Sequence, residues 1–288
     1  MRPDVPDKRG WLKRAITRPP FRDEAGRKGW FEWVSRAQRH LNRKLALNLE
    51  GWPRWSRPLR VALLSDFHTG SHADDVARLR AIVAEAQAGR PDLVLLGGDF
   101  VNMQLWGGGR IPPRITAAIL GELRAPLGSF AVLGNHDYYY GAAEVQSALE
   151  TNGITVIADK ARELRFEDEA FDLVGVPDAK HYPDAYRSLL AELSPQRPTI
   201  VLAHDPYWFT HLPAGPYLML SGHTHGGQIC FPLIGPLRNA SRAPLKWTYG
   251  LIVEGGRHLY VTSGLGTSAV PVRWNIPPEI VLLEVNGR

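Results

Sequence analysis

Short apolar runs, each followed by polar residues, constrain the fold of this chain more than any other feature of its sequence. In the first half these runs alternate with stretches of helical periodicity. The runs cover residues 59–66, 91–99, 128–137 and 154–157, and the helical stretches cover 74–89, 115–125 and 142–153. Uninterrupted apolar runs of this length indicate strands that are buried on both faces. Their alternation with helices predicts a parallel sheet of the α/β class.

The second half carries more strands than helices. Its apolar runs cover residues 171–176, 199–204, 217–222, 251–254, 258–264 and 279–285. We expect these runs to form a second, mixed sheet that packs face to face on the first. The predicted fold class is therefore α/β, a four-layer α-β-β-α sandwich of two mixed sheets flanked by helices. A chain of 288 residues with 44% hydrophobic content is long enough for such a core.

Residues 30–49 predict an amphipathic helix ahead of the sandwich. Its apolar stripe comprises Trp30, Val34, Ala37, Leu41 and Leu45, and its basic face comprises Arg36, Arg39, Arg43 and Lys44. The three- and four-residue spacing of the stripe is typical of one helix face. Residues 51–58 are rich in Gly, Pro and Ser and predict a linker. We therefore divide the chain into a basic N-terminal helical extension with its linker, residues 1–58, and a folded domain, residues 59–288.

Charge is distributed unevenly between these two parts. The first sixty residues carry 16 Lys and Arg against 6 Asp and Glu, a net +10. The remainder carries 18 against 23, a net −5. A basic segment on an acidic body indicates an anionic partner. Three interpretations stay open for the segment: a helix packed on the domain with a solvated basic face, a helix lying on anionic lipid, or a contact with nucleic acid.

Tryptophans favour an interface for the N-terminal segment. They are Trp11, Trp30, Trp33, Trp52 and Trp55. We expect residues 11–49 to contact an anionic membrane surface, whereas the acidic body disfavours nucleic acid. No apolar run of the sequence reaches the length of a bilayer span, and the N-terminus lacks the apolar core of a secretory signal. The expected location is the cytoplasm, with peripheral contact to the inner membrane.

Residues that bind metals gather where the predicted strands end. The five stretches are Asp66-Phe67-His68, Gly98-Asp99, Gly134-Asn135-His136-Asp137, His204-Asp205 and Gly222-His223-Thr224-His225. In open α/β sheets, ligands bind beyond the carboxyl ends of the strands. The donors are carboxylates, a carboxamide and imidazoles, which suit Mn²⁺, Fe, Zn²⁺ or Ni²⁺. The single cysteine, Cys230, excludes a thiolate cluster and an internal disulfide.

Two pairs of ligands at i and i+2 predict two metal ions. In an extended segment such residues point the same way, so Asp66 and His68 can reach one side of a cavity, as can His223 and His225. The glycines around the second pair let the backbone turn close to the ions, and a large side chain at Gly222 should crowd the site, as should one at Gly226. Each stretch alone is commonly structural. Five together, each after an apolar strand, indicate a metal centre.

In this order the motifs "DFH", "GGDFVN", "GNHD", "AHDP" and "SGHTHGGQ" resemble those of the calcineurin-like metallophosphoesterases. The tail "LYVTSGLGTSAVPVRWNIPPEIVLLEV" is similar to the bacterial YkuE/YaeI-like branch, whose relatives include UDP-diacylglucosamine hydrolases of lipid A biosynthesis. The resemblance covers residues 59–286. It implies that Asp66, His68 and His225 hold a first metal, that Asn135, His204 and His223 hold a second, and that Asp99 bridges them. It also implies that His136 is the catalytic histidine and that Asp137 orients it.

The resemblance implies a hydrolase that depends on two divalent metal ions, with Mn²⁺ as the expected ion. Two such ions roughly 3.5–4 Å apart can share a water and lower its pKa from 15.7 towards about 7. The hydroxide so formed would attack a phosphodiester or pyrophosphate bond. His136 would protonate the leaving group or contact the phosphate. The alternatives are a nucleotide or nucleic-acid phosphodiesterase of the same mechanism, and a non-catalytic metal-binding scaffold, against which the complete ligand set argues.

The loops 100–114 and 228–250 are apolar, and both should project near the metals. They are interpreted either as ordinary packing or as an apolar wall for an amphiphilic substrate of the UDP-diacylglucosamine type. Arg238 is a candidate contact for the anionic head of such a substrate. Arg273 is a second candidate, which could clamp a phosphate or pair with the acidic body.

Overall fold

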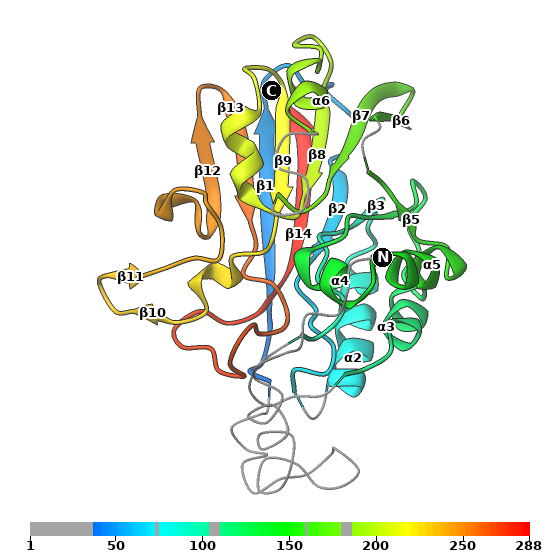
Figure 1. Cartoon of the computed structure of the whole chain (residues 1–288). Coiled ribbons are helices and arrows are strands. Elements are labelled where there is room, and N and C mark those ends of the chain that lie inside the picture. Colours follow the sequence, from blue (N-terminus) through cyan, green and yellow to red (C-terminus); the bar gives the residue numbers. More distant parts are fainter. Residues whose placement is uncertain (1–36, 73–74, 104–109, 159–160, 180–185) are drawn as a thin grey trace, which may run out of the picture.

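The fold contains two six-stranded mixed sheets with helices outside them (Figure 1). The computed structural model describes residues 37–72, 75–103, 110–158, 161–179 and 186–288. The expectations for Trp11, Trp30, Trp33, Val34 and Arg36 lie outside these residues. No helix in the described ranges is long and apolar enough to cross a membrane.

The first sheet has the strand order β1-β14-β2-β3-β4-β5. Its strands are β1 (Leu41–Leu49), β2 (Leu59–Leu64), β3 (Leu93–Leu96), β4 (Ser129–Ala131), β5 (Thr155–Val156) and β14 (Glu279–Gly287). Strands β2 to β5 run parallel, as predicted, and β14 runs antiparallel to β2. The helices that follow these strands are α2 (Asp75–Ala88), α3 (Pro113–Leu120), α4 (Asn135–Tyr140) and α5 (Ala142–Thr151).

The second sheet has the strand order β12-β13-β9-β8-β7-β6. Its strands are β6 (Ala161–Phe166), β7 (Glu169–Val176), β8 (Thr199–Ala203), β9 (Tyr217–Ser221), β12 (Gly250–Glu254) and β13 (Arg257–Val261). Around it lie α6 (Arg187–Ala191), the 3₁₀ helices η1 (Pro206–His211), η2 (His225–Gly227) and η3 (Leu245–Trp247), and a small hairpin of β10 (Cys230–Phe231) and β11 (Gly235–Pro236). Strand β6 was not predicted.

Alternation along the strands builds the layers of the core. In β2, Val61 and Leu63 face the second sheet, whereas Ala62 and Leu64 face the helices. The inner faces of both sheets form one apolar cluster, and a second cluster lies between the first sheet and α2, α3 and α5. A third lies on the outer face of the second sheet with η1 and α6. Because each face is buried, the strands are continuously apolar, and the predicted four-layer sandwich is confirmed.

Residues 41–49 form a strand, so the predicted helix is wrong over this range. Strand β1 pairs in parallel with β14 through nine residue pairs. Its inward-facing residues Leu45, Leu47 and Leu49 are separated by exposed residues. A period of two is typical of a strand with one solvated face, and the spacing of Leu41 and Leu45 fits either period. The sheet therefore begins ahead of residue 59, where the folded domain was expected to start.

Three side chains assigned to the basic, Trp-rich surface belong to the body of the protein. Trp52 and Trp55 are buried in the core between the sheets and pack edge to face on each other at 6.0 Å. The Arg43 guanidinium donates to the buried carboxylate of Glu279 at 2.7 Å. These residues stabilise the sandwich, so they do not support a membrane role for this segment.

Strand β14 was expected in the second sheet and lies in the first. It occupies the place between β1 and β2 (Figure 1). Its apolar residues there, buried on both faces, are Ile280, Val281, Leu283 and Val285. Alternating apolarity does not say which of two sheets a strand joins, because both sheets offer the same kind of buried surface. The antiparallel direction of β14 is what makes the first sheet mixed.

Candidate dinuclear metal site

The predicted ligands converge at one edge of the sandwich because they follow the carboxyl ends of neighbouring strands. Asp66 and His68 come after β2, and Asp99 comes after β3. The ligand Asn135 opens helix α4 after β4. His204 follows β8, and His223 and His225 follow β9. The turns after β2 and β3 are tied together, since the Asp66 N–H donates to the Gly98 carbonyl at 2.9 Å.

A first cluster contains Asp66, His68 and His225, as the resemblance implied. Their ligand atoms lie within 4.8 Å of one another, and all three residues are buried. The two Nε2 atoms of His68 and His225 are 3.1 Å apart, and Nε2 of His225 is 3.6 Å from Oδ1 of Asp66. Nitrogen and oxygen ligands held 2.0–2.2 Å from one ion lie roughly 3.0–3.5 Å apart, so these separations fit a single cation.

A second cluster contains Asp99, His204 and His223. Nδ1 of His223 lies 3.1 Å from Nε2 of His204, which again fits two ligands of one cation. The buried Asn135 has a side-chain oxygen with no hydrogen-bond partner among the described residues. An amide oxygen left in this state requires a partner, and a hard cation would provide one.

Asp99 lies between the two clusters. Its Oδ2 is 3.4 Å from Nε2 of His68 and 3.5 Å from Nε2 of His204. Its other oxygen accepts the backbone N–H of His136 at 2.8 Å. One oxygen therefore faces a ligand of each cluster, which is the position that a bridging carboxylate must occupy.

Five of the ligands have left-handed backbone conformations. Asp66, His68, Asp99, His223 and His225 have φ between 41° and 68°. The ligands at i and i+2 do reach the site, but the predicted reason, an extended segment, is wrong. The strands end before the ligands. Each of these five ligands is itself in the left-handed region, which is unfavourable for a residue with a side chain, and this conformation turns the side chain inward. Such conformations persist only where the surrounding structure holds them.

Glycines make room for this backbone. A Cβ on Gly222 would overlap the carboxylate of Asp66, and a Cβ on Gly226 would meet Cγ1 of Ile276 at 2.7 Å. Gly226 also has a left-handed φ of 60°. Both positions therefore reject larger side chains. A side chain at Gly222 would crowd a ligand, as expected, whereas one at Gly226 would collide with Ile276 and not with the ligands.

Hydrogen bonding directs His204 into the site. Its Nδ1 lies 2.7 Å from the Gly97 carbonyl, so Nδ1 carries the proton and Nε2 presents its lone pair to the cluster. Burial acts to lower the pKa of His204, but the facing carboxylates of Asp99 and Asp66 outweigh it and raise the pKa well above its usual value. The same negative charge would attract a metal cation in place of the proton.

His68 has the opposite electrostatic surroundings. Its burial, aided by the charge of His136, lowers its pKa to about 3. The ring is therefore neutral at neutral pH, as a metal ligand must be. Nδ1 of His68 and Nε2 of His223 are buried with no hydrogen-bond partner among the described residues. Carboxylates, an amide oxygen and imidazole nitrogens together match the preferences of borderline and hard divalent ions.

His136 stands beside the ligands and is partly exposed. Its ring packs edge to face on His68 with 4.5 Å between centroids, and its Nδ1 has no partner among the described side chains and backbone groups. A partly exposed imidazole at this place can reach a molecule bound at the metals. Its burial lowers the pKa of His136, and the Asp99 carboxylate opposes that shift.

Asp137 has a different role from the predicted one. Its carboxylate accepts the backbone N–H groups of Gly134, Asp99 and Phe100, each at 2.9 Å. None of its hydrogen bonds among the described residues reaches the ring of His136. Asp137 therefore positions the backbone of Asp99 and the start of α4, and it is not the group that orients the catalytic candidate.

Neither predicted substrate contact lies free at the metals. Arg273 is 4% exposed, and its guanidinium donates to the carbonyls of Ser263, Gly266 and His225. It therefore holds the backbone around His225, and burial lowers its pKa to about 10. Arg238 is exposed after the β10–β11 hairpin, and no contact joins its side chain to a ligand among the described residues.

The loop 100–114 is only partly an apolar wall. Phe100 and Val101 are buried in the core beneath the first sheet, and Phe100 stacks on Phe67 with 5.2 Å between centroids. Residues 104–109 lie outside the described ranges.

Two carboxylates lie beside His223: Asp205, which the sequence places in a metal-binding stretch without a specific role, and Asp178, which was not predicted. Asp178, Asp205 and His223 present ligand atoms within 4.8 Å of one another, and Oδ2 of Asp205 is 3.8 Å from Nε2 of His223. At this separation Asp205 makes no hydrogen bond to the ring, so it acts on His223 through its negative charge. Asp178 follows the end of β7 just as Asp66 follows that of β2, so the strand-end rule could have found it.

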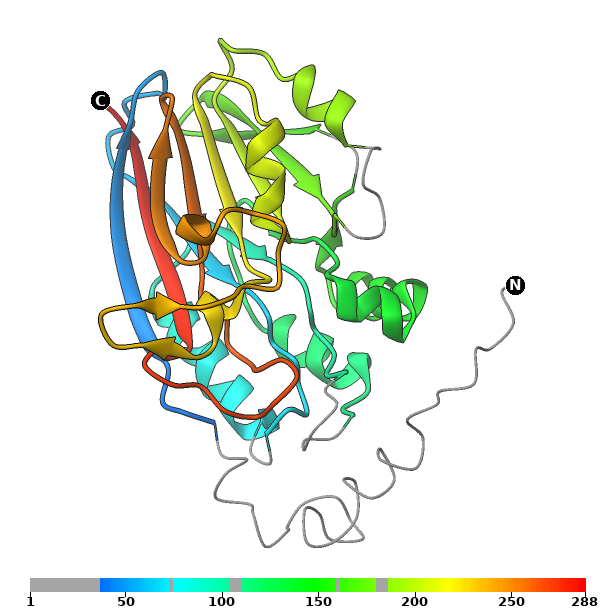
Figure 2. The same ribbon diagram turned by 60° about the vertical axis from the view of Figure 1, so that its left-hand side comes forward.

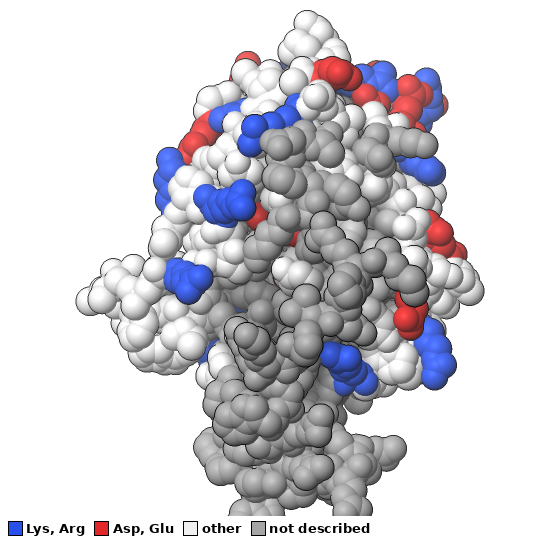
Figure 3. Space-filling view, in the orientation of Figure 1, with Lys and Arg blue, Asp and Glu red and all other residues white. Residues whose placement is uncertain are grey.

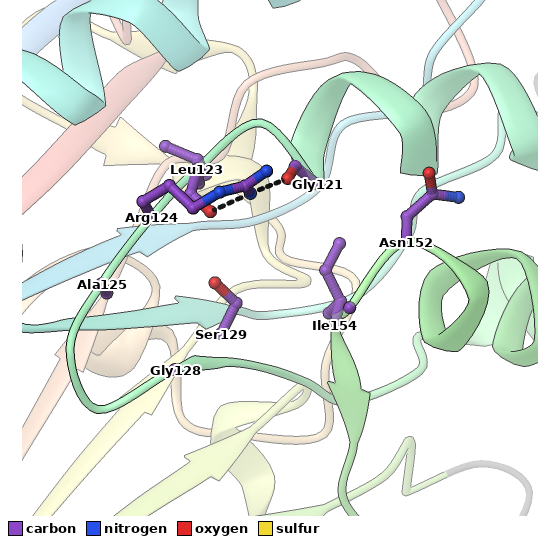
Figure 4. A pocket seen from close by; sticks show the side chains of 9 residues that line it. Gly121, Leu123, Arg124, Ala125, Gly128, Ser129, Asn152 and Ile154 are labelled. Atoms are coloured by element: carbon purple, nitrogen blue, oxygen red, sulfur yellow. Dashed lines mark hydrogen bonds between the residues drawn. The ribbon is translucent and has the colours of Figure 1, made fainter.

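A hollow lies at the end of the first sheet opposite the ligands, near the start of β4 (Figure 4). It has a volume of about 260 Å³ and is lined by Gly121, Leu123, Arg124, Ala125, Gly128, Ser129, Asn152, Gly153 and Ile154. Since its lining contains no carboxylate, imidazole or thiol, it offers no metal site.

Comparisons with known proteins give relatives of this chain. The sequence profile of the family described as calcineurin-like phosphoesterase matches residues 59–227. Phosphodiesterase YaeI of Escherichia coli is 31% identical over 89% of this chain and 89% of its own length. Metallophosphoesterase YkuE of Bacillus subtilis is 29% identical over 79% of each chain. Among solved structures, NAD nucleotidase of Haemophilus influenzae aligns with a TM-score of 0.48 and 14% identity, covering 72% of this chain and 45% of that one.

Proposed function

This chain belongs to the calcineurin-like phosphoesterase family, and on that premise we propose that it cleaves a phosphodiester or pyrophosphate bond in an amphiphilic, lipid-linked substrate at a membrane surface. The observation that carries the hydrolytic part is the position of Asp99, one of whose oxygens faces ligands of both clusters. We propose Mn²⁺ as the ion of both sites, because the donors are oxygen and imidazole nitrogen without thiolate.

When bound, two divalent cations supply a water of lowered pKa and neutralise phosphate oxygens. The chain's own task is to hold its ligands ready for them. Buried carboxylates and imidazoles held at fixed separations need little rearrangement, and such preorganisation is often the largest contribution to catalysis. Gly97 contributes by fixing the orientation of His204 through a hydrogen bond. The carboxylate of Asp205 faces Nε2 of His223 from 3.8 Å and acts on it through its charge.

His136 is the group proposed to deliver a proton to the departing oxygen or to contact the phosphate. It is the imidazole of the motif that is partly exposed, while the histidines of the two clusters are buried. Its backbone N–H is bonded to Asp99, so the ring is held at a fixed place relative to the bridging carboxylate. General acid assistance of this kind contributes about 10²–10⁴-fold to a rate.

Apolar side chains beside the site support an amphiphilic substrate. Ile229 and Trp274 form a parallel β-bridge just after the His225 turn, and both side chains are partly exposed. Val272 is exposed next to them. A UDP-diacylglucosamine-type molecule presents a phosphate to the metals and acyl chains to such a surface. The similar protein from Escherichia coli is named a phosphodiesterase, which supports the diester or anhydride bond as the reacting group.

A substrate panel with Mn²⁺ supplied tests this proposal. The panel compares a phosphomonoester, a phosphodiester, a nucleoside diphosphate sugar, its diacylated form, a cyclic nucleotide and single-stranded DNA. We expect the highest kcat/KM for the diacylated form. Preference for the cyclic nucleotide or the DNA would replace the lipid proposal by a nucleotide phosphodiesterase. Absence of hydrolysis throughout, in protein that holds two ions per chain, would contradict the hydrolytic proposal.

A further inference from the structure

The β10–β11 hairpin carries an exposed apolar tip. Its side chains Phe231, Leu233, Ile234 and Leu237 are exposed, with Leu233 at 108% and Ile234 at 71% of full exposure. The hairpin projects from the body in both views of the chain (Figures 1 and 2). Contiguous exposed apolar side chains of this kind mark a surface that meets a partner or a membrane.

The turn of this hairpin breaks the usual preference for polar or flexible residues. Leu233 has a left-handed φ of 66°, a conformation in which Gly, Asn or Asp is the ordinary choice. A leucine here is disfavoured both by its backbone and by its contact with water. Local rules broken in this way are expected at functional positions.

The hairpin is firmly connected to the metal site. It begins five residues after His225, and the N–H of Cys230 donates to the carbonyl of Trp274 at 2.9 Å. The ring of Phe231 packs edge to face on Trp274 at 5.2 Å. Gln228 fixes the same junction, since its amide donates to the carbonyls of Ser268 and Val270. Whatever the tip contacts is therefore held at a fixed position relative to the ligands.

The surroundings of the tip are basic. Residues 206–253 contain no Asp or Glu and carry the exposed cations Arg238, Arg242 and Lys246. Lys246 forms an ion pair with Glu254, so Arg238 and Arg242 contribute most of the net positive charge around the tip. Figure 3 shows the projection free of charged side chains at its end, with Lys and Arg on the neighbouring surface. An apolar tip within a basic surround is complementary to anionic lipid.

We propose that the β10–β11 hairpin inserts Leu233 and Ile234 into an anionic bilayer and so places the metal site against the membrane surface. The basic surface then rests on lipid headgroups. This inference deepens the proposed function, on which its biological meaning rests, and it assigns membrane contact to a part of the chain outside the N-terminal segment. Binding to vesicles is measured without turnover, so the two proposals can fail separately.

Flotation of the full chain with vesicles tests the hairpin. The variant Leu233→Ser with Ile234→Ser removes apolar area and leaves charge unchanged. Its matched control is Leu251→Ser with Val253→Ser, which alters two exposed apolar side chains of β12. On phosphatidylglycerol vesicles we expect the hairpin variant to partition at least about tenfold more weakly than the wild type, and the control to equal the wild type. Because the N-terminal segment is present in every protein, its contribution cancels.

A charge variant and a lipid-free measurement complete the test. Arg238→Gln with Arg242→Gln should weaken binding to phosphatidylglycerol about tenfold and change binding to phosphatidylcholine little. Hydrolysis of a soluble diester by the hairpin variant should match the wild type. Equal flotation of the hairpin variant and the wild type would overturn the proposal. So would sedimentation of the wild type as a dimer that the hairpin variant abolishes, because the tip would then bind a second copy of this chain.

Discussion

The carboxylate of Asp137 accepts the backbone N–H of Asp99 at 2.9 Å, and this bond fixes the bridging carboxylate from behind. The same side chain accepts the N–H groups of Gly134 and Phe100. In Asp137→Asn one oxygen becomes an amide donor that faces backbone donors. We expect metal affinity to fall about 10–100-fold and unfolding free energy to fall by about 2 kcal/mol. Metal titration and urea unfolding measure the two effects.

The outcome also separates the two roles considered for Asp137. If its task were to orient His136, the variant would keep its metal affinity and lose only turnover. Unchanged metal affinity in Asp137→Asn would therefore contradict the positioning role that the hydrogen bonds indicate.

Asp99→Asn removes the negative charge between the clusters. Since one oxygen of Asp99 faces ligands of both, the variant should release at least one of the two ions. The geometry of the side chain is nearly preserved, so folding should be affected less than metal content. Elemental analysis after gel filtration measures the number of ions per chain, and two ions still bound would show that Asp99 does not bridge.

His136→Ala should keep both ions and lose about 10²–10⁴-fold in kcat on an unactivated diester. The ring lies within 4.8 Å of the ligand atoms of His68 and Asp99, but each of the two clusters contains three ligands without it. His258→Ala is the matched control, because His258 is half-buried on β13, away from the strand ends that carry the site. Turnover by His136→Ala at the wild-type rate would remove His136 from the reaction.

The strand at residues 41–49 predicts a large effect on unfolding free energy at one position and a small effect at the adjacent one. Leu47 is 5% exposed and faces the core, whereas Ala46 is exposed. Leu47→Asn should lower the unfolding free energy by about 3 kcal/mol, because it removes buried apolar area and buries an amide. Ala46→Asn should change it by less than about 0.5 kcal/mol. Equal effects in urea unfolding would contradict the observed register of β1.

The Arg57–Asp92 ion pair should give stability that depends on pH. Both Nη atoms of Arg57 donate to Asp92, at 2.7 and 2.8 Å, and the Arg60 N–H donates at 2.9 Å. Burial acts to raise the pKa of Asp92, but these bonds outweigh burial and hold it below its usual value. A depressed carboxylate pKa stabilises the fold above the unfolded pKa of about 3.9, and the contribution is lost as pH falls through the folded pKa.

Asp92→Asn should therefore lower the unfolding free energy at pH 7 by about 1 kcal/mol, a modest value because Arg57 is half-exposed. The difference from the wild type should shrink as pH falls below about 4. Glu122→Gln in the exposed pair with Arg80 is the control and should have no measurable effect at either pH. A difference for Asp92→Asn that stays constant from pH 7 to pH 3 would contradict the linkage.

Much of the site could be predicted because its signals are local. Asp66, Asp99 and His204 each follow an apolar strand, and parallel strands end at one edge. The layers could also be predicted, since continuous apolar runs require burial on both faces. Asp178 also follows an apolar strand, β7, so the same rule applied to that strand would have found it. Asp205 was seen in the sequence, but its place beside His223 depends on the fold.

Other features depend on contacts between distant segments. Residues 41–49 contain leucines whose spacing fits both a helix and a strand. Only the pairing with β14 makes this segment a strand. The sequence suggested that Arg273 contacts phosphate, but its guanidinium donates hydrogen bonds to the surrounding loop carbonyls. The left-handed backbone of Asp66 and His225 has no sequence signal except the glycines near them. These features are set by tertiary packing, which overrides local preference.

The left-handed ligands have a consequence for transplanting this centre into another scaffold. Seven side chains copied onto the flat edge of an idealised sheet would not reproduce it, because five of them take their directions from residues whose φ angles are positive. The transferable unit is the pair of turns after β2 and β9, including Gly222 and its close approach to Asp66. A designer would have to import that strained backbone, together with the neighbours that hold it, before choosing any ligand.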